Sequence, residues 1–237
     1  MELKVVVPTD LSEITLDQYQ RFARLDGDEE FLTHKMLEIF CNVPLDKLPN
    51  IKFKSLSGVV NRLHGMFSSK PSLKIKFTIG KQEFGFVPNL EDITFGEYVD
   101  LDNYMSSTAD LHKTMAVLYR PITQDLGKRY DIEPYESSEK YSELMKQAPM
   151  DVVLGATLFF WRLGSDLLNA TIRSLENPKT SIHQKRSSDA NGAGILLSTT
   201  SLKEMSQSLK MLEDWAFINA SPFSHLTKKK ETLNESN

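Results

Sequence analysis

Hydrophobic residues recur every three or four positions through most of the first 176 residues, and this spacing predicts a largely helical chain. The pattern predicts shorter helices at 15–25, 29–43, 55–67, 94–104, 109–119 and 138–147. The longest predicted helix begins at Pro149, a residue suited to the first turn, and runs to Glu176. It is apolar almost all round through Leu163, so we expect neighbouring elements or another subunit to enclose it.

A different pattern, alternation of apolar and polar residues, predicts one β-hairpin between residues 73 and 88. Its first strand would place four apolar side chains on one face: Leu73, Ile75, Phe77 and Ile79. The residues GKQ turn the chain, and EFGFVP forms the returning strand. A short apolar run at 2–7 predicts a further strand that could join the hairpin. These elements together indicate an α+β fold that is predominantly α-helical, with a small antiparallel sheet.

The stretch between the hairpin and the longest helix also holds residues without a clear period. Pro121 is expected to end the helix at 109–119, because proline cannot continue a helix. The sequence TQDLGKRYDIEPYES, at 123–137, predicts an irregular connector anchored by Tyr130, Ile132 and Tyr135.

Two stretches of the chain carry the same motif: EITLDQYQRF begins at Glu13, and EDITFGEYVDLD begins at Glu91. Each follows a short apolar run that ends in Val-Pro. In each, a threonine followed three residues later by Gln or Glu predicts a capping box: Thr15 with Gln18, and Thr94 with Glu97. The two units, 2–25 and 84–104, arose by an internal duplication or are one kind of joint used twice; the sequence leaves both open.

The composition changes after residue 176. We expect residues 1–176 to form a single globular α+β domain, and 177–200, rich in Ser, Thr, Asn, Gly and basic residues, to form a flexible loop. An amphipathic helical segment is predicted at 201–220, with its helix over 201–217, and 221–237 reads as a polar tail. The apolar residues of that helix are Leu202, Met205, Leu209, Leu212 and Phe217.

Charge and composition exclude several classes of protein. The net charge of −4 gives no overall basic character, so we expect no specific nucleic-acid binding. The single cysteine, Cys41, has apolar neighbours and reads as an inert core thiol in a reducing compartment. The first residues lack the pattern of a signal peptide, and no apolar run approaches the roughly 20 residues that span a bilayer. We therefore expect a cytoplasmic protein that does not enter a membrane.

The motifs of common enzymes are missing from the sequence. The five histidines have no spacing typical of metal ligands, and no nucleophile elbow, phosphate-binding loop or dinucleotide fingerprint is present. The acidic pairs Asp100 with Asp102 and Glu91 with Asp92 could act in acid–base chemistry or bind a cation, but their places beside helix starts favour a dipole-complementing role. No catalytic, cofactor-binding or metal-binding residue is therefore assigned.

Large apolar side chains are the better candidates for a binding role. We assign partner binding to Phe160, Trp161, Leu209, Leu212 and Trp215. Trp161 also fits a core position. Gly155 and Gly164, within the longest predicted helix, would let another backbone approach closely.

Three blocks of sequence carry a resemblance to a known family: FGFVPNLEDITFGEYVDLDNY, LHKTMAVLYRPI and YSELMKQAPMDVVLGATLFFWRLGSDL. Over roughly residues 84–168, the chain resembles tailed-bacteriophage proteins encoded among the structural and tail-assembly genes. The resemblance implies a non-enzymatic role in virion morphogenesis. Members look most like tail assembly chaperones, which hold the tape-measure protein before the tail tube polymerises around it. Some relatives resemble baseplate-hub assembly proteins.

These observations leave three functional hypotheses. The first is a tail assembly chaperone-like protein of the host cytoplasm, which binds a tape-measure, baseplate or neck protein as an oligomer or hetero-complex. The second is a structural subunit of the virion, at the head–tail joint, tail or baseplate. The third is a small enzyme with a site of scattered acids. Under the first hypothesis, we expect the helix at 201–217 to cover, or swap into, a groove formed partly by 149–170.

Overall fold

The computed structural model describes residues 6–44, 47, 53–127 and 129–176. These residues form seven α-helices and a four-stranded antiparallel sheet, so the predicted α+β, predominantly helical fold is confirmed. The predicted loop, amphipathic helix and tail at 177–200, 201–220 and 221–237 lie outside the described residues. The predicted strand at 2–7 lies mostly outside them too, and its last two residues, Val6 and Val7, are not in a strand.

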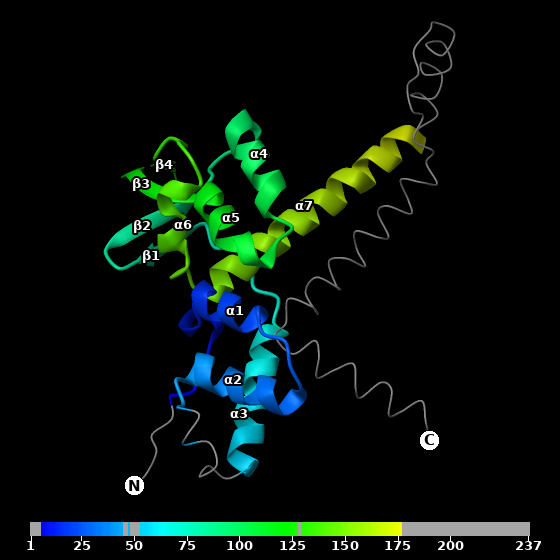
Figure 1. The fold of residues 1–237 in the computed structure, drawn as a ribbon. Coiled ribbons are helices and arrows are strands. Elements are labelled where there is room, and N and C mark those ends of the chain that lie inside the picture. Colours follow the sequence, from blue (N-terminus) through cyan, green and yellow to red (C-terminus); the bar gives the residue numbers. More distant parts are fainter. Residues whose placement is uncertain (1–5, 45–46, 48–52, 128, 177–237) are drawn as a thin grey trace, which may run out of the picture.

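The first three helices make one end of the molecule, at the bottom of Figure 1. They are α1 (Leu16–Ala23), α2 (Glu29–Cys41) and α3 (Phe53–Phe67), close to their predicted positions. Aromatic rings join the three helices: Phe40 of α2 lies 5.4 Å from Phe22 and 5.5 Å from Phe67, between ring centroids. These buried rings belong to the same hydrophobic core as the buried residues of the sheet and of α7.

The sheet lies at the other end and consists of two hairpins. The predicted hairpin is confirmed as β1 (Lys76–Ile79) and β2 (Gln82–Phe86), in which Phe77 pairs with Phe84. The second is formed by β3 (Tyr119–Asp125) and β4 (Tyr130–Ile132), and the strand order is β1-β2-β3-β4.

The second hairpin corrects two predictions. Residues 123–137 are not an irregular connector throughout, and Pro121 does not end a helix: it lies within β3, opposite Phe84. Pro121 has no amide hydrogen to donate, but its carbonyl oxygen accepts a hydrogen bond from the Glu133 amide at 2.9 Å, so it still takes part in the ladder between β3 and β4. The Tyr130 hydroxyl donates to the Phe86 carbonyl at 2.7 Å, which ties β4 back to β2.

The burial of the apolar side chains of the first strand also differs in part from the prediction. Phe77 and Ile79 are buried as expected, but Ile75 precedes β1 and is 54% exposed. Its carbonyl oxygen accepts the Phe86 amide at 2.8 Å, so the backbone of Ile75 continues the ladder while its side chain faces solvent.

Four more helices complete the fold: α4 (Phe95–Tyr104), α5 (Leu111–Leu118), α6 (Glu139–Met145) and α7 (Met150–Glu176). Helix α7 leaves the body of the molecule at its far end in Figure 1. Its first turns are buried through Leu158, but Phe160 and Trp161 are only half-buried and Leu163 is 41% exposed. Within this chain, neighbouring elements therefore enclose α7 fully only over its first turns, and enclosure of its outer part by another subunit stays a prediction.

The two copies of the repeated motif have the same local structure. In both, an Asp or Asn side chain caps a single 3-10 turn, and the predicted Thr capping box then begins a helix. The two copies differ in the elements to which they are hydrogen-bonded. The first is bonded to the start of α7: the Leu16 amide donates to the Ala148 carbonyl, and the Met150 amide to the Ile14 carbonyl, both at 2.9 Å. Internal duplication and one kind of joint used twice both stay open.

Candidate partner-binding groove

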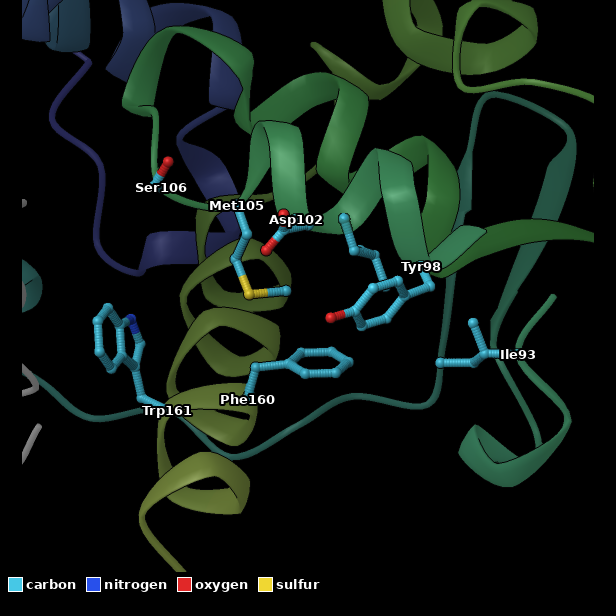
Figure 2. Close-up of a pocket in the computed structure, with 8 residues that line it drawn as sticks. Ile93, Tyr98, Asp102, Met105, Ser106, Phe160 and Trp161 are labelled. Carbon is cyan, nitrogen blue, oxygen red and sulfur yellow. The ribbon is translucent and has the colours of Figure 1, made fainter. Parts of the chain in front are cut away.

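An apolar hollow lies between α4 and the exposed part of α7 (Figure 2). We call it the α4–α7 groove, and its volume is about 460 Å³. Eight residues form its walls: Ile93, Tyr98, Leu101, Asp102, Met105, Ser106, Phe160 and Trp161.

The wall from α4 follows from the helical period. Tyr98, Leu101 and Met105 are spaced at i, i+3 and i+7, so they form one stripe along the helix. Leu101 is buried, whereas Tyr98 is 62% exposed, and the stripe therefore runs from the core out to solvent. Ile93 precedes the capping residue Thr94, and the capping box holds it beside the first turn.

Buried polar contacts fix α4 to the sheet. The Glu97 carboxylate accepts hydrogen bonds from the Thr94 amide and hydroxyl, at 2.8 and 2.7 Å, and forms a buried ion pair with Arg120 of β3 at 2.5 Å. The Arg120 guanidinium also lies over the ring of Tyr135, whose hydroxyl donates to Asp100. Because these contacts hold the inner side of α4, its outer stripe is presented in a defined orientation.

The wall from α7 is tied to the sheet through aromatic packing. Phe159 and Phe160 lie 5.7 and 6.0 Å from the Phe86 ring, and 5.4 Å from each other, between centroids. Figure 2 shows Phe160 and Trp161 on the same stretch of α7, facing the side chains of α4. Trp161 is the outermost aromatic of this wall, and it remains partly exposed in the described structure.

The chemistry of the groove is mostly apolar. Among its eight described residues, Asp102 alone carries a carboxylate. Its predicted partner Asp100 instead accepts the Tyr135 hydroxyl, and Asp92 accepts the Asn89 amide at 2.6 Å, so these acids serve separate local contacts. In the described part of the chain, no group of three or more His, Cys, Asp or Glu side chains could hold a metal ion. The arrangement suits burial of apolar side chains.

The cysteine behaves as the sequence indicates. Cys41 is buried at the end of α2, and this burial raises the pKa of its thiol to about 11. At neutral pH the thiol is therefore protonated, and the reactive thiolate is scarce.

The groove contains two of the residues that we assigned to partner binding from the sequence. Phe160 and Trp161 lie together in its α7 wall, whereas Leu209, Leu212 and Trp215 lie outside the described residues. The α4 wall was missed. The sequence did indicate it through the helical spacing of the apolar residues at 98, 101 and 105. Spacing alone, however, does not show whether other parts of the fold cover these side chains.

None of the helices that the structure describes has the length and apolar character needed to cross a bilayer. Comparison of the chain with protein-family models, with curated proteins and with solved structures finds no match.

Proposed function

We propose that this chain is a non-enzymatic protein of tailed-phage morphogenesis that binds an apolar helix of a partner in the α4–α7 groove. The single observation that supports it most is the groove itself: an open apolar stripe on one helix faces aromatic side chains on another. This is the geometry in which proteins recognise amphipathic helices, through anchors spaced at i, i+3, i+4 and i+7. Its role would be that of a tail assembly chaperone, acting in the host cytoplasm.

The expected strength of such binding suits a chaperone. Each fully buried aliphatic anchor contributes about 1.5–3 kcal/mol, and the groove has room for a small number of anchors. Association costs about 4–15 kcal/mol in lost freedom of motion, and ordering of side chains adds to this cost. The surplus is small, so binding at this groove alone would be weak and reversible. A client held in this way can be released when the tail tube forms around it.

The partner class comes from the sequence resemblance. In the proteins that the chain resembles, the chaperone holds the tape-measure protein before the tail tube polymerises around it, so the tape-measure protein is the first candidate partner. A baseplate or neck protein is the other candidate partner. The position of the gene beside a tape-measure gene would favour the first.

The test is co-expression with the tape-measure protein encoded in the same genome, followed by affinity purification. We expect Tyr98→Asp with Trp161→Asp to reduce co-purification at least tenfold, because both changes place charge in the groove. The matched control is Phe95→Asp with Leu163→Asp, which adds the same charge at exposed apolar residues of the same helices that do not form the walls of the groove. Equal loss in both variants would contradict binding at this groove.

Mass spectrometry of purified virions separates the chaperone role from the structural one. A chaperone is absent from finished particles. A fixed copy number of this chain per particle would instead make it a virion subunit at the head–tail joint, tail or baseplate.

A further inference from the structure

We propose that residues 201–217 of the same chain occupy the α4–α7 groove when no partner is bound, so that a partner helix must displace them. This inference rests on the proposed function, because it gives the groove a competitor built into the chain. The segment would act as a placeholder that covers apolar surface until the client arrives.

The first support is the match between the segment and the groove. Leu202, Met205, Leu209 and Leu212 are spaced at i, i+3, i+7 and i+10, which places them on one face of a helix. Ten residues separate the first and last of these anchors, a rise of about 15 Å. Helix α4 has 10 residues and thus also extends for about 15 Å. The apolar face of the segment therefore has the length of the wall that it would cover.

The second support is the length of chain that joins the segment to the groove. Trp161 lies 15 residues before the end of α7 at Glu176, a distance of about 22 Å along the helix. The 24 residues at 177–200 then lead to Ser201. A flexible chain of this length has a root-mean-square end-to-end distance of about 25–29 Å, from about 5–6 Å times the square root of the number of residues. The tether thus matches the distance that it must bridge.

Because of this match, residues 201–217 need only a weak affinity for the groove in order to occupy it. When the length of a tether matches the distance between two sites, the effective concentration of one at the other is in the millimolar range. A segment with a dissociation constant of about 1 mM as a free peptide would then occupy the groove for about half of the time or more. A second copy of the chain, at micromolar concentration, would not compete with it. This comparison favours the segment of the same chain as the occupant.

Trp161 gives a direct readout in the full-length protein. The chain has two tryptophans, so Trp215→Phe leaves Trp161, in the groove, as the only one. Fluorescence quenching by acrylamide is then measured with and without Leu209→Asp and Leu212→Asp. We expect these two changes to raise the quenching constant of Trp161 at least twofold and to shift its emission to longer wavelength. Leu209→Ser with Leu212→Ser should give a smaller change in the same direction.

The control variant carries Gln207→Asp with Lys210→Gln, which changes the charge by the same amount on the polar side of the segment. It should leave quenching unchanged. Circular dichroism and a thermal melt confirm that each variant keeps the fold. Equal quenching of Trp161 in all variants would overturn the inference. Protection that depends on protein concentration, with a dimer on gel filtration, would also overturn it, because the segment would then come from a second copy.

The same variants separate this inference from the proposed function. If both hold, Leu209→Asp with Leu212→Asp increases co-purification of the tape-measure protein, because the groove is already open. If the segment protects Trp161 but no tape-measure protein is captured by any variant, the inference stands and the proposed function fails. If the client is captured at the groove and Trp161 is equally exposed in every variant, the inference fails alone.

Discussion

Replacement of Gly155 by alanine sets two effects of opposite sign against each other. Gly155 lies within α7, where alanine is favoured over glycine by about 0.8–1 kcal/mol in helix propensity. However, a Cβ atom at this position would lie 2.4 Å from the carbonyl oxygen of Ser72 and 3.0 Å from its carbonyl carbon. Ordinary van der Waals contact needs at least 3.4 Å, so the backbone at Ser72 would have to move by about 1 Å.

The backbone at Ser72 has little freedom to move away. Two residues further on, the Lys74 carbonyl oxygen accepts the Tyr119 hydroxyl at 2.7 Å, and the Lys74 ammonium pairs with Asp151 of α7. Overpacking against a constrained neighbour costs about 1–3 kcal/mol. The steric cost exceeds the gain in propensity over most of this range, so we expect Gly155→Ala to lower the free energy of unfolding by up to about 2 kcal/mol.

The matched control is Gly58→Ala in α3. Gly58 also lies within a helix, but a Cβ atom there would meet nothing within 4 Å. We expect this change to raise the free energy of unfolding by about 0.5–1 kcal/mol. Urea unfolding followed by circular dichroism measures both variants. If Gly155→Ala stabilises the protein as much as Gly58→Ala, then α7 does not pack against Ser72 as described.

Two further predictions concern buried polar groups. Glu97→Gln should lower the free energy of unfolding by about 3 kcal/mol, because it leaves the Arg120 guanidinium buried without a carboxylate. The double variant Glu97→Leu with Arg120→Met removes both charges, so it should lower the free energy of unfolding by less in the same urea assay. A larger loss in the double variant would show that the ion pair itself is strongly stabilising. Burial lowers the pKa of His112 below its ordinary 6.5, and the Gln20 amide, 3.1 Å from Nδ1, favours the neutral ring. As the pH falls below 6.5, the unfolded chain binds this proton before the folded one does, so stability should decrease from pH 7.5 to 5.5. His112→Gln should flatten that decrease, and an unchanged slope would count against a buried neutral His112.

Local interactions explain what the sequence predicts well. Thr15 and Thr94 cap their helices because each hydroxyl accepts the backbone amide of the residue three positions later. The side chain of that residue, Gln18 or Glu97, accepts the threonine amide in return, so the whole relation lies within one turn. The hairpin at Lys76–Phe86 is likewise set by alternation and a short turn. The close approach at Gly155 was also indicated, since only glycine leaves room for the Ser72 carbonyl.

The missed features depend on distant parts of the chain. Tyr119 and Pro121 enter a strand because β2 offers an edge more than 30 residues earlier, and the Tyr119 ring packs at 5.1 Å from Phe77. The α4–α7 groove joins residues near 98 with residues near 160. Periodicity shows that each of these segments has an apolar face, but only the packing of the whole fold determines which faces stay uncovered.

The continuity of α7 has a mechanical consequence. One helix carries both the half-exposed Trp161 and the buried Met150, whose amide is bonded to the Ile14 carbonyl. About 16 Å of unbroken helix separates the two residues, and a helix this short is stiff. A side chain that pushes the outer part of α7 away from α4 would therefore tilt the whole helix, and this tilt would strain the hydrogen bond between Met150 and Ile14, just before α1.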